Sequence, residues 1–128
     1  MIAYGANGIL VVDPDPGERG RLQRELESRG WRVWVASDAA TAVQVYAEQR
    51  DDVHAAIVDL QLPGLQAGRV LADLEQLTPA LPRFAMAADL TPYTAAAFRR
   101  ITHTPLFAKP VSAGEPDAAL RHSVDVAT

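Results

Sequence analysis

Three ionisable residues in this sequence stand directly after short apolar runs, and their chemical types suit phosphoryl transfer. They are Asp13, Asp59 and Lys109. Carboxylate oxygens are the ligands that a hard divalent cation prefers, and an ammonium group can neutralise the charge of a transferred phosphoryl group. Asp59 could serve as metal ligand and nucleophile together. Taken alone, each residue more often caps a strand end or forms a local ion pair, so phosphoryl chemistry requires a fold that brings the three together.

The apolar runs are strand-sized and alternate with helical patterns. Residues 9–12 are wholly apolar, which is typical of a strand buried on both faces of a parallel sheet. Residues 17–29 favour a helix, because Leu22 and Leu26 lie one turn apart and Gly30 can stop it. Further strands are predicted at residues 31–35, 54–59, 84–88 and 106–108.

Four more helical patterns follow these strands. Ser37 or Asp38 can cap the second helix, Thr91 with Pro92 can begin the fourth, and the last is predicted after Ser112. The predicted apolar faces are, in order, Ala39, Ala42, Val43 and Tyr46; Val70, Leu71, Leu74 and Leu77; Ala97, Phe98 and Ile101; and Ala119, Leu120 and Val124.

Strands that alternate with helices must form a mostly parallel sheet with right-handed crossovers. We therefore predict a doubly wound α/β fold of the flavodoxin-like (βα)5 kind, with strand order 2-1-3-4-5 and helices on both faces. In such sheets, ligands bind outside the carboxyl ends of the strands. Asp13, Asp59 and Lys109 all fall at those ends, so we expect them to converge at one edge of the sheet.

Composition narrows the class of protein. The chain has 128 residues, which predicts a single domain over residues 1–128, and a net charge of -4 without a basic stripe, which argues against nucleic-acid binding. It has no cysteine, so neither a disulfide framework nor a thiolate metal site is possible. Its apolar runs are too short to cross a membrane and no leader segment is recognisable, so we expect a cytoplasmic protein.

Three segments resemble the signature segments of response-regulator receiver domains. They are residues 9–13 (ILVVD), residues 56–64 (AIVDLQLPG) and residues 108–110 (AKP). The resemblance implies a two-component signalling module rather than an enzyme. It also implies that Asp59 accepts a phosphoryl group from a histidine kinase or phosphotransfer protein, that Lys109 contacts this group, and that a downstream protein partner reads the result.

The same resemblance implies a Mg²⁺ site. Its ligands would be Asp13, Asp59 and the main-chain carbonyl of Gln61. The Lys109–Pro110 peptide would be cis, a form that only an X-Pro bond adopts cheaply.

The segment after the first strand departs from the family pattern. Pro14 stands where receivers usually carry a second acid, so we expect weak Mg²⁺ binding. Asp15 could compensate by swinging inward, but Pro14 and Pro16 leave it little freedom.

The usual switch pair is also absent. Ala87 stands where the family carries Thr or Ser, and its side chain cannot donate a hydrogen bond. Leu106 occupies the place of the aromatic residue in the fifth strand. Phe107 lies beside it, but strand alternation should point Phe107 to the other face of the sheet.

Three interpretations remain open from the sequence. The first is a working receiver, and the second is a pseudo-receiver, a module that keeps the fold but signals by docking to proteins without phosphorylation. The third is a phosphatase, because Asp13 and Asp15 also resemble the nucleophile and the acid/base of haloacid-dehalogenase-like enzymes. Nothing after Lys109 supplies that family's later acidic metal motif.

Overall fold

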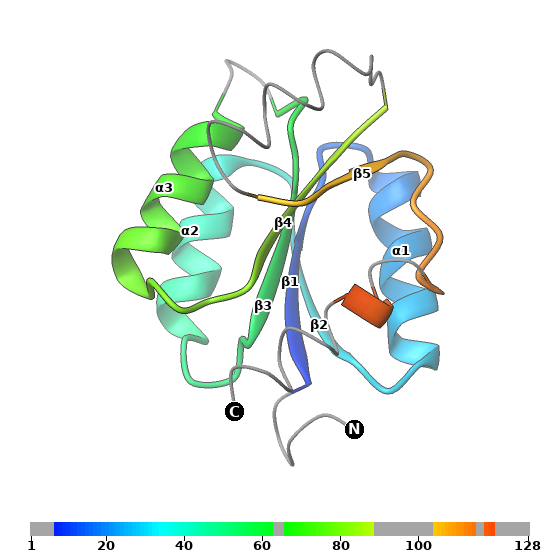
Figure 1. Cartoon of the computed structure of the whole chain (residues 1–128), viewed down its shortest axis with the longest axis horizontal. Coiled ribbons are helices and arrows are strands. Elements are labelled where there is room, and N and C mark those ends of the chain that lie inside the picture. The colour runs from blue at the N-terminus through cyan, green and yellow to red at the C-terminus, as the bar shows by residue number, and fades with distance from the viewer. Residues whose placement is uncertain (1–6, 63–65, 89–103, 115–116, 120–128) are drawn as a thin grey trace.

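The computed structural model describes residues 7–62, 66–88, 104–114 and 117–119 of the chain. The elements are β1 (Gly8–Val12), α1 (Pro16–Ser28), β2 (Arg32–Ala36), α2 (Ala39–Glu48), β3 (Ala55–Asp59), α3 (Ala67–Leu77), β4 (Arg83–Ala87) and β5 (Leu106–Ala108). All strand pairs are parallel and the order is β2-β1-β3-β4-β5, as the sequence predicts. Helix α1 covers one face of the sheet, and α2 with α3 covers the other (Figure 1).

The predicted strand and helix boundaries agree with these elements to within one residue or two. The fourth predicted helix, which would begin near Thr91 and Pro92, lies outside the described residues. For the last one, residues 114 and 117–119 are helical, while Leu120 and Val124 lie outside the description. Within the part of the chain that the structure describes, no helix is both long and apolar enough to span a bilayer.

The central strands separate two hydrophobic clusters. Every residue of β1 and of β3 is buried, and apart from Gly8 and Asp59 all of them are apolar, as expected for strands that are covered on both faces. Leu10 and Val12 point into the cluster beneath α2 and α3, whereas Ile9 and Val11 point into the cluster beneath α1. This alternation fixes the register of β1. It also fixes the point at which the strand ends and Asp13 begins.

Local capping sets where the helices begin and end. Asp15 caps α1, since its Oδ1 accepts the Gly17 N–H at 2.9 Å, and Asp38 caps α2 by accepting the Thr41 N–H at 2.8 Å. The hydrogen bond from the Thr41 main chain is the largest cause that lowers the pKa of Asp38. Gly30 has a φ of 95°, a left-handed conformation that suits glycine and ends α1 as predicted.

Candidate functional site

The carboxyl ends of β1, β3 and β5 bring together the three predicted residues. Lys109 Nζ lies 2.6 Å from Asp59 Oδ2 and 2.9 Å from Asp13 Oδ2. Both aspartates are only 1% exposed. The predicted convergence is therefore confirmed, and the three side chains form one buried cluster.

The electrostatics of this cluster are those of two acids that share one cation. Burial raises the pKa of Asp13, although the hydrogen bond from Lys109 partly offsets this effect. For Lys109, burial lowers the pKa, but the hydrogen bonds to Asp59 and Asp13 outweigh it and the pKa is raised overall. Lys109 is consequently a cation at neutral pH. If both acids are ionised, the cluster carries an excess negative charge that attracts a further cation.

The main chain holds the second oxygen of each carboxylate. Asp13 Oδ1 accepts the Asp15 N–H at 2.9 Å, and Asp59 Oδ1 accepts the Gln61 N–H at 2.8 Å. Each acid thus has one oxygen toward Lys109 and the other on the backbone two residues further along. This arrangement fixes both side-chain orientations before any ligand arrives.

The residues after Asp13 do not supply a second acid. Pro14 has no carboxylate, and the exposed Asp15 directs its side chain to the first turn of α1 rather than to Lys109. The expectation that Asp15 has little freedom to swing inward agrees with this geometry. It also disfavours the phosphatase interpretation, because Asp15 would have to be the acid/base.

Sequence reasoning missed one residue next to this cluster. Arg19, on α1, donates from Nη1 to the main-chain carbonyl of Asp13 at 2.8 Å. No sequence motif predicts this contact, because it depends on how α1 packs beside the end of β1. Its effect is to anchor the segment that presents Asp13.

The donor set of the cluster fits a hard cation. Asp13 and Asp59 offer carboxylate oxygens, which suit Mg²⁺. No group of three His, Cys, Asp or Glu side chains that could hold a metal occurs among the described residues. The cluster therefore offers two carboxylates, and Pro14, the residue after Asp13, adds none.

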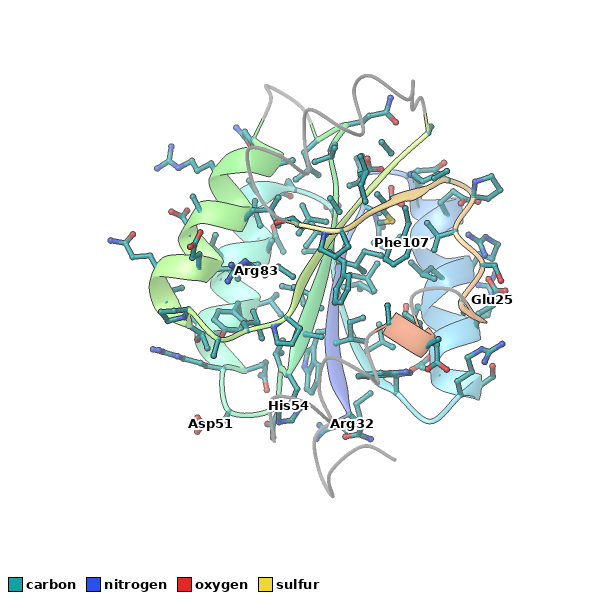
Figure 2. All side chains as sticks on the ribbon, in the orientation of Figure 1. Glu25, Arg32, Asp51, His54, Arg83 and Phe107 are labelled. Carbon is teal, nitrogen blue, oxygen red and sulfur yellow. The ribbon has the colours of Figure 1, made fainter. Side chains whose placement is uncertain are left out.

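The two positions predicted from the resemblance to be switch positions, Ala87 and Leu106, are apolar and packed. Ala87 and Leu106 are 4% and 5% exposed and share a small cluster with Ala85. Phe107 instead stacks on Phe84, with ring centroids 5.9 Å apart, on the α1 side of the sheet (Figure 2). The predicted alternation of this strand is confirmed, because Leu106 and Phe107 pack in clusters on opposite faces of the sheet.

The turn after β3 makes a contact that the sequence did not predict. Gln61 is exposed, and its side-chain Oε1 accepts the main-chain N–H of Ala88, directly after β4, at 3.4 Å. Because Gln61 also bonds to Asp59 through its own N–H, it joins the ends of two strands. The Lys109–Pro110 peptide is cis, as expected from the resemblance.

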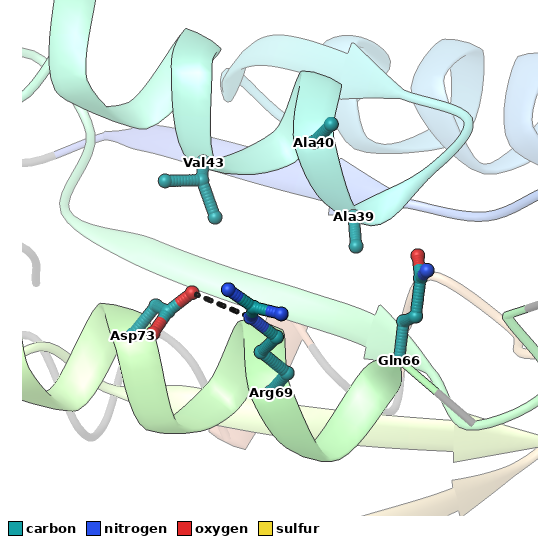
Figure 3. Close-up of a pocket in the computed structure, with 6 residues that line it drawn as sticks. All are labelled: Ala39, Ala40, Val43, Gln66, Arg69 and Asp73. Carbon is teal, nitrogen blue, oxygen red and sulfur yellow. Dashed lines mark ion pairs between the residues drawn. The ribbon is translucent and has the colours of Figure 1, made fainter. Parts of the chain in front are cut away.

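Other polar features lie away from this cluster. His54 and Asp51 lie at the opposite, amino-terminal edge of the sheet (Figure 2). A hollow of about 370 Å³ lies between α2 and α3, and Arg69 and Asp73 form an ion pair of 3.9 Å at its rim (Figure 3). Neither acid of the cluster lines this hollow, nor does Lys109.

Comparison with known proteins identifies the family to which this arrangement is similar. The family model described as "Response regulator receiver domain" matches residues 9–121. The chain is 32% identical to the probable transcriptional regulatory protein TcrX of Mycobacterium tuberculosis over 74 residues. These aligned residues make up 58% of this chain and 31% of that protein. It is also 32% identical to the sensory/regulatory protein RpfC of Xanthomonas campestris pv. campestris over 111 residues. This alignment covers 84% of this chain and 15% of that protein. The chain thus spans less than a third of the length of either relative.

Solved structures agree with the family match. A response regulator receiver domain protein from Clostridium thermocellum superposes with a TM-score of 0.82 at 20% identity, covering 93% of this chain and 94% of that chain. A response regulator from Burkholderia pseudomallei, crystallised with a phosphorylated aspartic acid, calcium ion and citrate, gives a TM-score of 0.75 at 26% identity. That comparison covers 94% of this chain and 70% of the other.

Proposed function

Since this chain belongs to the response regulator receiver domain family, we propose that Asp59 is its phosphoacceptor and Lys109 the residue that contacts the phosphoryl group. Receiver domains are signalling modules of two-component systems, and they interact with histidine kinases or phosphotransfer proteins. They generally bind Mg²⁺ at the phosphorylation site. A downstream protein partner would then read the state of Asp59.

The observation that supports this assignment best is the 2.6 Å contact between Lys109 Nζ and Asp59 Oδ2 in a nearly inaccessible cluster. An Asp59 oxygen would attack the phosphorus of a phosphohistidine, forming a P–O bond as the P–N bond breaks. The leaving imidazole nitrogen keeps the electron pair and takes up a proton. Lys109 neutralises charge on the transferred group, and this stabilisation is strong because little water reaches the site.

A Mg²⁺ ion would be held by Asp13, Asp59 and the main-chain carbonyl of Gln61. When bound, the ion supplies further neutralisation of phosphoryl charge. We propose that it binds weakly, because Pro14 removes one carboxylate from the usual set.

A pseudo-receiver is the second candidate, and a specific observation favours it. All four carboxylate oxygens of Asp13 and Asp59 already have a partner in Lys109 or in the main chain, so the two acids are partly compensated without a metal. Ala87 offers no hydroxyl to a phosphoryl oxygen. In this case the domain would signal by docking alone.

Acetyl phosphate with Mg²⁺ separates the two candidates. We expect intact mass spectrometry to show the addition of one phosphoryl group to the wild type and to Asp73→Asn, a control acid on α3, but not to Asp59→Asn. Beryllofluoride with Mg²⁺ should also shift the amide resonances of Leu60 and Lys109. A wild type that gains no mass and shows no such shifts is a pseudo-receiver.

A further inference from the structure

Gln61 contacts the candidate phosphoacceptor and the neighbouring strand at the same time. Its main-chain N–H donates to Asp59 Oδ1 at 2.8 Å, and its side-chain Oε1 accepts the N–H of Ala88 at 3.4 Å. The first contact is a charge-assisted hydrogen bond and therefore the stronger one. The hydrogen bond from the Ala88 N–H to Gln61 Oε1 is longer and has a neutral acceptor, so it is the weaker of the two. We therefore expect a change at Asp59 that moves Gln61 to alter this weaker hydrogen bond.

Among the described residues, the end of β4 makes few other contacts through which a change at Asp59 could reach it. The Ala87 side chain carries no donor, and its main-chain carbonyl is used by the Lys109 N–H at 2.8 Å. The Met86 carbonyl is used by the Leu60 N–H at 2.8 Å. These two bonds belong to the main-chain ladder and hold the strand ends in register. Among the described residues, the side-chain hydrogen bond that joins the turn after Asp59 to the end of β4 is the one from Gln61.

We propose that Gln61 is a positioning residue that transmits the state of Asp59 to the end of β4, where the Ala87 side chain makes no such link. A side-chain amide suits this role because it carries an acceptor and two donors. While Asp59 is unmodified, its Oδ1 accepts the main-chain N–H of Gln61, and the Gln61 side-chain Oε1 accepts the N–H of Ala88. A change at Asp59 alters the best acceptor for the Gln61 N–H, moves the turn, and lengthens or shortens the contact to Ala88.

In a working receiver this change is phosphorylation, and that part of the inference rests on the proposed function. A phosphoryl group brings three strong acceptor oxygens to the turn. Because charged acceptors form stronger hydrogen bonds than neutral ones, the donors of Gln61 and Ala88 would be redistributed toward it. The link itself also exists without phosphorylation and can be tested in the untreated protein.

The first test concerns the hydrogen bond to Ala88. We expect exchange of the Ala88 amide with water, measured by NMR, to rise about two- to tenfold in Gln61→Met, which keeps the size of the side chain and removes the acceptor. Gln61→Glu retains an acceptor and should not show the rise. Gln76→Met, on the exposed face of α3, is the control for an equivalent change elsewhere. An Ala88 exchange rate that is the same in wild type and Gln61→Met would overturn the link.

The second test concerns transmission and uses a double-mutant cycle without any phosphoryl donor. Asp59→Asn changes the acceptor of the Gln61 N–H, and we expect it to shift the Ala88 amide resonance when Gln61 is present. The same substitution in a Gln61→Met background should produce less than half of that shift. Equal shifts in the two backgrounds would show that Gln61 transmits nothing. Because both tests use untreated protein, a failure of beryllofluoride to bind would refute the proposed function and leave this result standing.

Discussion

Pro14 determines how many carboxylates the candidate metal site can offer. We predict that Pro14→Asp strengthens Mg²⁺ binding roughly tenfold or more, since an added ligand or anchor typically changes metal affinity by about 10–100-fold. Titration followed by NMR or calorimetry measures the change. Pro16→Asp is a matched control, because it adds the same charge on the first turn of α1, where Asp15 is the cap. Equal affinities for wild type and Pro14→Asp would show that another group already fills the position.

Lys109 forms ion pairs with two buried acids, Asp13 and Asp59, so its removal should be costly. Breaking a buried ion pair by deleting one partner costs about 3–5 kcal/mol, because the other partner stays buried and charged. We predict a loss of this size in the free energy of unfolding of Lys109→Met at neutral pH, measured with urea, and a partial recovery when Mg²⁺ is added. Arg69→Met should lose little, since the Arg69 side chain is 82% exposed and its pair with Asp73 is 3.9 Å long. A Lys109→Met variant as stable as the wild type would contradict the charged cluster.

The raised pKa of Lys109 also gives a pH dependence. A base whose pKa is higher in the folded state than its ordinary value of 10.5 stabilises the fold below that value. The contribution is then lost as the pH rises through the folded-state pKa. We predict that the stability difference between wild type and Lys109→Met shrinks above about pH 10.5. Taking the difference between the two proteins cancels the titration of groups that they share. A difference that stays constant over this range would mean that Lys109 is not held by its acids.

Side chains differ in how far the sequence predicts their positions and contacts. Asp13, Asp59 and Lys109 were predictable, because an apolar run marks the strand and the residue after it must lie at the carboxyl edge. The contacts of Arg19 and Gln61 were not, because they depend on helix packing and on the path of a long side chain across a turn.

The hydrophobic periodicity of the sequence predicts the strands and helices, and the small errors in their boundaries have physical causes. The second strand was predicted to begin at Trp31, but β2 begins at Arg32. Trp31 is apolar and β-prone, and its neighbours suggest a strand, yet its N–H bonds to the Leu26 carbonyl at the end of α1. Its side chain is buried in the cluster beneath α1. Tertiary packing thus decides a boundary that local pattern leaves ambiguous.

Trp31 also joins the start of β2 to the last described helical residues. Its Nε1–H donates to Asp117 Oδ1 at 2.6 Å, and Asp117 is 8% exposed. We predict that Asp117→Ala lowers the free energy of unfolding by about 1–3 kcal/mol, because a buried donor loses its charged acceptor, and that it changes the Trp31 fluorescence. Asp73→Ala, which removes an acid from the surface of α3, should leave both unchanged within error. Unaltered stability in Asp117→Ala would show that this contact does not hold the segment to the sheet.

The candidate functional residues lie at the carboxyl edge of the central sheet, and the hydrophobic core packs on both faces of this sheet. The cluster of Asp13, Asp59 and Lys109 lies where three strands end, so any change there acts first on the turns that leave that edge. How far a change at Asp59 spreads is therefore the main functional question for this fold.

We predict that the spread toward β5 is weak in the wild type. A ligand shifts a conformational equilibrium only by its differential affinity for the two states, and Ala87 cannot form a hydroxyl–phosphoryl hydrogen bond in either. Such a charge-assisted bond is worth roughly 1.5–3 kcal/mol, enough to change a population by about tenfold or more. Leu106 packs against Ala87, and its aliphatic side chain has no aromatic ring that could move together with a hydroxyl group.

The test is to restore both groups in an Ala87→Thr, Leu106→Tyr double variant. With beryllofluoride and Mg²⁺ at saturation, the amide resonances of Leu106 or its replacement and of Phe107 should move further in the double variant than in the wild type. Both positions are buried, so the larger side chains are expected to cost about 1–3 kcal/mol of stability. Urea unfolding of the double variant and of each single variant therefore precedes the comparison. A wild type whose Phe107 amide already responds as strongly as that of the folded double variant would show that phosphorylation reaches β5 without a hydroxyl or an aromatic switch.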